Sequence, residues 1–257
     1  MRLLRHDGMI LCVVFFAFVC LTVGVARGAG EIRPLKPFPD ERAAMTALEA
    51  QNTPANRAAL AKIRFVHAGD LMEEFTRVRE PGSMVWAMDY AQSATELDPS
   101  SAQYWFLAGY LYGQAPSHPE MAKRAEAALK KAIDLDPEYS DAMALLGMLY
   151  VRMARYRDAL DPLEDAIKRQ PRQADPMLFS ALCQAYVFGK KTWRGEKFFK
   201  SLIDKRRQPD VVKIALATLW QQTGKTDKAR SLLDEVIRDP KAQAGDREGA
   251  RLLRKDI

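Results

Sequence analysis

The sequence predicts an all-α fold of stacked helix pairs, on three observations. The segments Glu96–Pro99 (ELDP) and Asp134–Pro137 (DLDP) are near copies of each other, and Pro171 follows the second by 34 residues. A period of this length is typical of repeated supersecondary units rather than of one layered core. Apolar residues also recur with helical periodicity, and no segment is convincing as a strand.

The clearest unit lies between Ser140 and Pro171. It has small residues where two antiparallel helices would cross closely and large apolar residues that would fill the space within and between units. Its final proline would end the second helix by removing a backbone donor. The residues that define the unit are Met143, Leu146, Gly147, Tyr150, Ala159, Leu163, Ala166 and Pro171. Their spacing resembles that of the tetratricopeptide repeat.

Neighbouring units follow this pattern with decreasing fidelity. The preceding unit has four extra residues in its inter-helix loop, and its pattern residues are Trp105, Ala108, Gly109, Tyr112, Ala125, Leu129, Ala132 and Pro137. The following unit has Cys183 where glycine is usual and otherwise keeps Phe179, Leu182, Tyr186, Gly195 and Phe199. The last convincing unit contains Leu216, Ala217, Trp220, Gly224, Ala229, Leu233 and Pro240, and a degraded one contains Ala87, Ala91, Ala94 and Pro99.

The resemblance to the tetratricopeptide family covers roughly residues 68–240. It implies a right-handed superhelical solenoid of helix-turn-helix repeats, with a concave surface lined by the first helix of each unit. This scaffold serves many different partners, so the resemblance is specific for fold and nearly silent on function.

The N-terminus differs from the rest of the chain. Arg2 and Arg5 precede an unbroken apolar run from Met9 to Val23, and the small residues Gly24-Val25-Ala26 follow it. This pattern predicts a secretory signal peptide within residues 1–29, which would leave the body in the periplasm. The alternative is a retained anchor in the inner membrane, with the body facing the periplasm.

The remaining organisation follows from composition. Residues 30–40 contain three prolines and are expected to be an extended linker, and residues 41–100 to form N-terminal helices that include the degraded repeat. The repeats proper are expected over residues 101–240, and a capping helix over residues 241–257 would use Leu252 and Leu253 to cover the last apolar surface.

Charge gives a weak indication of partners. The net charge of +6 falls to +4 once the three basic and one acidic side chains of residues 1–29 are removed, which is mild for a nucleic-acid-binding protein. A basic cluster between Phe188 and Gln208 is interpreted first as the solvated side of an outer helix, with no nucleic acid as partner. An anionic membrane surface or an acidic protein is the alternative, through Lys190, Lys191, Arg194, Lys197 and Lys200.

The sequence offers little for catalysis, and we expect no enzyme activity, cofactor or metal. The three histidines lack companions at ligand spacing, and no nucleophile stands in a recognisable turn motif. Gly224-Lys225-Thr226 resembles the end of a phosphate-binding loop, but Leu219 occupies the position of its first glycine. Cys183 is the only cysteine of the body and is expected to be a buried hydrophobe.

The family resemblance places a set of largely apolar residues on the concave surface. The candidate partner-binding residues are Phe106, Tyr110, Met148, Val151, Arg152, Gln184, Val187, Phe188 and Ile214. An apolar groove of this kind suits an amphipathic helix or an extended peptide. The sequence therefore predicts a non-catalytic scaffold or adaptor of the cell envelope. The alternatives are a groove covered by the N-terminal helices, a self-assembling scaffold, and an accessory subunit that positions an envelope enzyme or redox complex.

Overall fold

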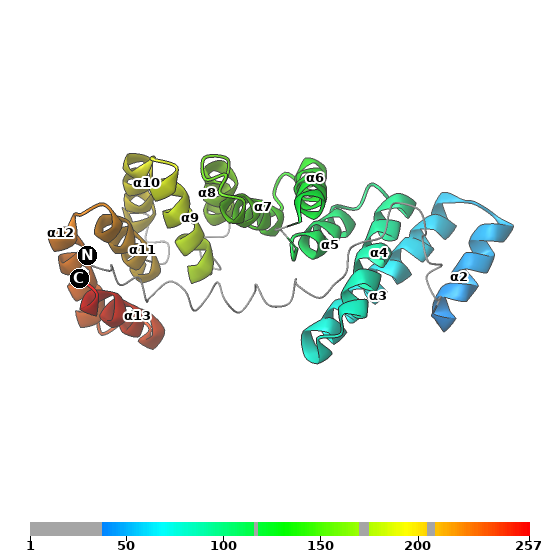
Figure 1. The fold of residues 1–257 in the computed structure, drawn as a ribbon, viewed down its shortest axis with the longest axis horizontal. Coiled ribbons are helices and arrows are strands. Elements are labelled where there is room, and N and C mark those ends of the chain that lie inside the picture. Colours follow the sequence, from blue (N-terminus) through cyan, green and yellow to red (C-terminus); the bar gives the residue numbers. More distant parts are fainter. Residues whose placement is uncertain (1–37, 116–117, 170–174, 205–208) are drawn as a thin grey trace, which may run out of the picture. The chain divides into compact units, whose positions relative to one another are not determined.

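The computed structural model describes residues 38–115, 118–169, 175–204 and 209–257, which form twelve helices and no strand (Figure 1). The predicted signal peptide (1–29), most of the predicted linker and Pro171 lie outside the described residues. The chain divides between Pro99 and Ser100 into two compact units, which are considered separately.

The first unit contains α2 (Pro39–Ala50), α3 (Pro54–Val78) and α4 (Pro81–Leu97). Thr53 caps α3 by accepting a hydrogen bond from the backbone N–H of Asn56 at 3.2 Å. Helices α3 and α4 pack together over a core of mostly small residues, namely Leu60, Ala61, Ala68, Ala87, Tyr90, Ala91 and Ala94. Because α2 already begins at Pro39, the last two residues of the segment expected as linker are helical.

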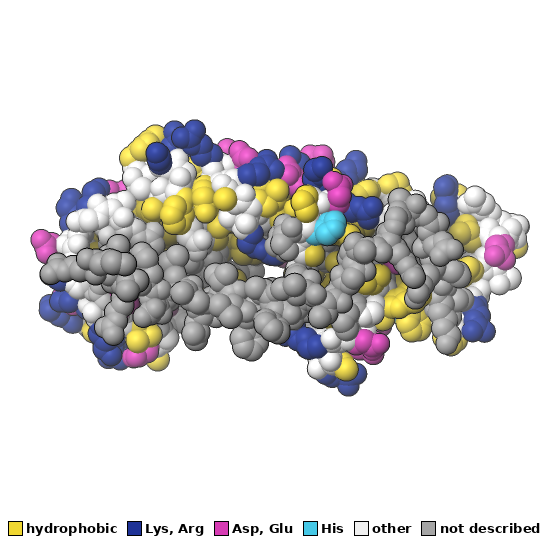
Figure 2. Space-filling model, viewed as in Figure 1, with side chains coloured by type: hydrophobic (Ala, Val, Ile, Leu, Met, Phe, Trp, Pro, Cys, Tyr) yellow, Lys and Arg dark blue, Asp and Glu magenta, His cyan; other side chains and the backbone are white. Residues whose placement is uncertain are grey.

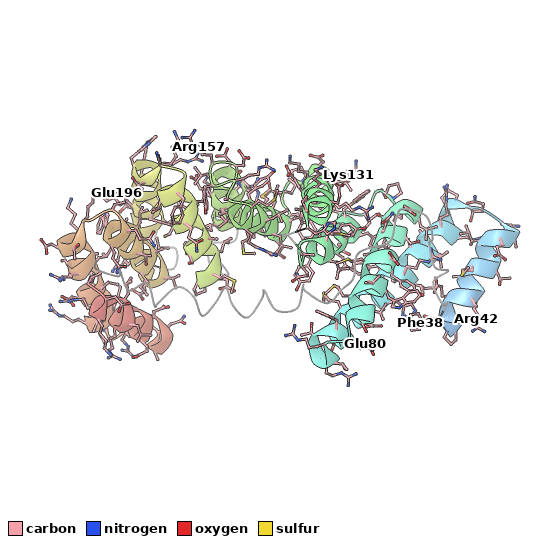
Figure 3. All side chains as sticks on the ribbon, viewed as in Figure 1. Phe38, Arg42, Glu80, Lys131, Arg157 and Glu196 are labelled. Atoms are coloured by element: carbon pink, nitrogen blue, oxygen red, sulfur yellow. The ribbon has the colours of Figure 1, made fainter. Side chains whose placement is uncertain are left out.

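A buried carboxylate fixes α2 to the other two helices. Glu41 is 0% exposed, and its carboxylate accepts hydrogen bonds from Arg64 Nε at 2.8 Å and from the Tyr90 hydroxyl at 2.9 Å. Beside it, Phe38, labelled in Figure 3, stacks on the His67 ring, and the ring centroids are 3.9 Å apart. A charged side chain that is buried away from solvent is tolerated only when it is ion-paired and hydrogen-bonded, as Glu41 is here. Burial, reinforced by the hydrogen bond to Glu41, raises the pKa of Tyr90.

The second unit is a succession of helix pairs. They are α5 (Ala102–Tyr112) with α6 (Pro119–Leu135), α7 (Ser140–Arg152) with α8 (Leu160–Arg169), α9 (Pro176–Phe188) with α10 (Thr192–Asp204), and α11 (Pro209–Gln222) with α12 (Thr226–Arg238), followed by α13 (Ala244–Lys255). Helix α9 packs against both α7 and α11, and α11 also contacts α13. The first helices α7, α9 and α11 therefore lie side by side (Figure 1).

Small residues let the two helices of a pair approach closely, as the sequence predicted. A Cβ atom added to Gly147 of α7 would lie 2.4 Å from Cγ of Leu163 in α8. The same addition to Gly109 would lie 2.7 Å from Cγ of Leu129. In the pair α9–α10 the tight position has moved to the second helix, where a Cβ on Gly195 would meet Tyr186 Cδ2 at 2.5 Å. Cys183 can therefore stand where the two preceding pairs have glycine.

The turns inside three successive pairs share one backbone geometry. Ala154, Lys190 and Gly224 each have a positive φ, of 56°, 58° and 77°. In each turn the next residue donates its backbone N–H to a carbonyl five residues earlier, at 2.8 Å: Arg155 to Tyr150, Lys191 to Tyr186, and Lys225 to Trp220. Because this bond recurs at the same place in each turn, it shows which residues of successive units correspond to one another.

Hydrogen bonds between polar side chains, called polar locks below, join α6 to α7 and α8 to α9. The Tyr150 hydroxyl donates to Glu126 at 2.9 Å, and the Tyr186 hydroxyl donates to Glu164 at 2.8 Å. Arg194 adds a charged hydrogen bond from its Nε to Glu164 at 2.6 Å. Burial of Tyr186, together with the neighbouring Glu164 carboxylate, raises the pKa of this tyrosine. The locks satisfy polar groups that the stack buries.

Helix α13 covers the end of the last pair. Ala250 is fully buried in a cluster with Ala217, Leu233 and Val236, and Leu253 packs against that cluster. Leu252 points the other way and is 55% exposed. Only one of the two leucines expected to face the apolar surface therefore does so.

Candidate functional site

The accessible side chains of the first helices form a continuous candidate surface. We call the accessible residues of α5, α7, α9 and α11 the first-helix surface. On α9 the exposed positions Met177, Ser180, Gln184 and Phe188 recur every three or four residues, so they lie along one side of the helix. Because α9 lies between α7 and α11, this stripe continues onto their accessible residues.

The structure places the apolar candidates of α5 and α7 in half-buried positions. Phe106 packs on Tyr139, with ring centroids 4.9 Å apart, and Tyr110, Met148 and Val151 are also half-buried. Arg152 is exposed and donates from Nη2 to the carbonyl of Gly113 at 2.6 Å. The apolar candidates of α5 and α7 are therefore less accessible than Phe188 of α9.

The candidates of α9 and α11 differ in accessibility. Gln184 is exposed, Phe188 is 53% exposed, and Val187 is half-buried. Ile214 packs against the apolar cluster at the C-terminal end and contributes little free surface. The accessible apolar part of the first-helix surface is thus centred on α9, where Met177 is 67% exposed.

A small hollow at the end of α9 was not found from the sequence. It has a volume of about 270 Å³ and is lined by residues 154–158 of the α7–α8 turn together with Phe188 and Gly189. The rings of Tyr156 and Phe188 meet there with centroids 5.0 Å apart. The available signal was the aromatic residue Tyr156 inside a turn, but its contact with Phe188 depends on how two successive units stack.

The basic cluster divides into paired and unpaired groups. Arg194 bonds Asp161 at 2.5 Å and Glu164 at 2.6 Å, whereas Glu196 accepts from Lys200 at 2.8 Å and from Lys225 at 2.6 Å. Hydrogen bonds from Lys200 and Lys225 lower the pKa of Glu196 to about 2.

Other basic side chains of this region have no carboxylate partner among the described residues. They are Arg157, Lys190, Lys191 and Lys197. Exposed Trp193 also belongs to this region, and Figure 2 shows apolar and basic side chains side by side over α9 and α10. Lys205, Arg206 and Arg207 lie outside the described residues.

The described residues contain no group of three His, Cys, Asp or Glu side chains that could hold a metal ion. Cys183 is buried, and burial raises the pKa of its thiol to about 12. Its Sγ–H points to the carbonyl of Ala215 at 3.3 Å, so the thiolate that nucleophilic chemistry requires is disfavoured. Among the described helices, none combines the length and apolar character needed to cross a bilayer.

Comparison with known proteins agrees with this architecture. A family model described as tetratricopeptide repeat matches residues 120–184. The crystal structure of YrrB, described as a TPR protein with an unusual peptide-binding site, is 18% identical, with a TM-score of 0.51 over 84% of this chain and 99% of that chain. TTC0263, a thermophilic TPR protein of Thermus thermophilus, is 16% identical, with a TM-score of 0.45 over 74% of this chain and 97% of that chain. No curated protein matches the sequence.

The fold and its repeated turns thus define an all-α solenoid of paired helices. Residues 120–184 match the tetratricopeptide-repeat family that the sequence pattern resembles, and the helix pairs confirm the predicted all-α solenoid fold.

Proposed function

We propose that this chain is a non-catalytic scaffold or adaptor of the cell envelope that holds an apolar or amphipathic segment of a partner protein on the first-helix surface. The observation that carries the proposal is the stripe on α9. Met177 and Phe188 stand 67% and 53% exposed at the two ends of a helix whose other face is buried. Large apolar side chains left in water at regular spacing mark interaction surfaces.

The polar residues of the stripe fit the same role. Ser180 and Gln184 lie between the two apolar ends and offer a hydroxyl and an amide for hydrogen bonds to a bound backbone. An apolar segment that lies along α9 would contact Met177 at one end and Phe188 at the other, with the polar pair between them. YrrB, which shares the fold, is described as having a peptide-binding site, and this likeness supports a peptide as the bound element.

The envelope location rests on the sequence of residues 1–29. Arg2 and Arg5, the apolar run Met9–Val23 and the small residues after it together have the form of a secretory signal peptide. Mass spectrometry of the N-terminus of the protein purified from its own cells tests this. Cleavage near Ala26 is the expected result, and Met1 retained on a cytosolic protein would overturn the location. Met1 on a membrane-bound protein would favour the anchor.

A matched pair of variants tests the surface. Met177→Ser with Phe188→Ser removes both exposed apolar anchors of α9, and Leu252→Ser removes an exposed apolar residue of α13 that lies outside the first-helix surface. Truncation of buried anchors commonly costs about 2 kcal/mol, which is a loss of affinity of roughly thirtyfold. The α9 variant should lose a captured envelope partner while Leu252→Ser keeps it, and both should retain the circular dichroism of the native protein. Equal capture by all three proteins would contradict the proposal.

A further inference from the structure

The hollow beside Phe188 departs from the pattern of the other turns. The shared 2.8 Å turn bonds of Arg155, Lys191 and Lys225 align the units, so the counterpart of Tyr156 one unit later is Thr192. The counterpart of Phe188 one unit later is Gln222. Where the next junction has a threonine and a glutamine, this junction has two aromatic rings in contact. The repeat fold does not need the rings, because the neighbouring turn adopts the same geometry without them.

The rim of the hollow is basic. Arg155 is already neutralised, since its guanidinium bonds Glu126 at 2.5 Å and Asp158 at 2.7 Å. Arg157 is different: its Nε donates to the carbonyl of Gly189 at 3.3 Å, and no carboxylate among the described residues pairs with it. The bond to Gly189 fixes the guanidinium at the edge of the hollow, where Arg157 is exposed (Figure 3).

Two further cations stand next to the hollow in the sequence. Lys190 and Lys191 follow Gly189 directly, and neither forms an ion pair with a described residue. The one carboxylate that lines the hollow, Asp158, is paired with Arg155. Among the described residues, Arg157, Lys190 and Lys191 therefore leave the region with a positive charge. An arginine with free terminal nitrogens is suited to bidentate binding of a carboxylate.

We propose that this hollow binds an acidic peptide segment of a partner protein. One large apolar side chain of the segment would pack on Tyr156 and Phe188, and a flanking Asp or Glu would pair with Arg157. This inference rests on the proposed function, because Phe188 also ends the α9 stripe, and it adds the chemistry of the partner. The volume of about 270 Å³ is just below the range of small-molecule sites, about 300–1,000 Å³, and suits a single side chain.

The pair of aromatic rings favours a peptide over an anionic membrane. A lipid surface would be held by dispersed cations, and it would gain nothing from two rings that face each other inside a recess. A peptide uses both features, because the rings supply the buried contact and the cations exclude partners of the wrong charge.

Selection from a random peptide library displayed on phage tests the inference with the full-length protein. Panning is carried out in parallel against the wild type, Arg157→Glu, Arg157→Lys and Tyr156→Ser. We expect the wild type to enrich sequences with Asp or Glu next to an aromatic or large aliphatic residue. A synthetic peptide of the enriched sequence should bind Arg157→Glu and Tyr156→Ser at least tenfold more weakly. Arg157→Lys should bind with an intermediate affinity, because it keeps the charge but loses the bidentate geometry. The affinity should fall as salt rises.

Three results would overturn the inference: no enriched class that depends on Arg157, enrichment of neutral or basic sequences, or binding of phosphatidylglycerol vesicles, and not of peptides, that Arg157→Glu abolishes. Unchanged circular dichroism melting of the variants excludes unfolding as the cause of lost binding. If Met177→Ser with Phe188→Ser still prevents capture of the natural partner while Arg157→Glu does not, the proposed function stands and only this inference fails.

Discussion

Gly147→Ala is the sharpest test of the close helix crossing. At an open position of a helix, replacing glycine by alanine stabilises the protein by about 0.5–1 kcal/mol, because the unfolded chain loses freedom. At Gly147 the new Cβ would lie 2.4 Å from Cγ and 2.6 Å from Cδ2 of Leu163, and 3.2 Å from the backbone nitrogen of that residue. Leu163 is fully buried, so its side chain has no free space to enter.

The expected effect follows from comparing the two terms. Overpacking of a core costs about 1–3 kcal/mol, which exceeds the gain in helix propensity. We therefore expect Gly147→Ala to lower the free energy of unfolding by about 1–2 kcal/mol, and Gly147→Leu to lower it further. Urea denaturation followed by circular dichroism measures the difference.

Gly249→Ala is the matched control, because Gly249 lies in α13 and a Cβ there would have no neighbour within 4 Å. It should stabilise the protein by about 0.5–1 kcal/mol. A second check is Leu163→Ala, which alone should cost about 2–5 kcal/mol but less in the Gly147→Ala background, since the clash is then gone. If Gly147→Ala proves as stable as Gly249→Ala, the crossing is not as close as described here.

Three other predictions concern polar contacts. Tyr186→Phe should cost about 1–2 kcal/mol, and a double-mutant cycle with Glu164→Gln should show coupling of similar size by urea denaturation; additivity would mean that their 2.8 Å hydrogen bond does not contribute. Glu196 has its pKa lowered to about 2, so its stabilisation is present above the ordinary value near 4.5 and is lost as pH falls toward 2. Glu196→Gln should thus cost about 0.5–1 kcal/mol at pH 7 and almost nothing near pH 2 in chemical denaturation, and a pH-independent cost would refute the assignment. Glu41→Ala should cost about 3–5 kcal/mol because it removes the buried carboxylate that binds both the half-buried Arg64 and Tyr90, and limited proteolysis should cut α2 first; unchanged protection of α2 would contradict this.

The repeated units could be predicted from the sequence because their determinants are local in the chain. Gly147 and Leu163 are required by the packing of one helix pair, and Gly109 and Leu129 make the same contact in the preceding pair. The same logic predicted that Cys183 and Phe199 would be buried. It did not show that Gly195 would take over the tight contact, because that depends on the ring of Tyr186 reaching across the pair.

The candidate surface could be predicted only in part. The family resemblance placed Gln184 and Phe188 on the concave surface, and both side chains are exposed on α9. It overestimated the exposure of Phe106, because its cover is Tyr139, a residue of the next unit. The contact of Tyr156 with Phe188 could not be predicted for the same reason. It depends on how successive units stack, and the sequence pattern of a single unit carries no information on that.

Site-specific photocrosslinking in living cells tests the central claim most directly. A photoreactive residue is placed at Ser180 or Gln184, both exposed on the first-helix surface, and for comparison at Lys123 or Lys130, both exposed on α6. The scaffold proposed here predicts crosslinks to the same partner protein from Ser180 and Gln184, and none from the α6 positions. Crosslinks from the α6 positions alone, equal crosslinks from all four, or none from any position would contradict it.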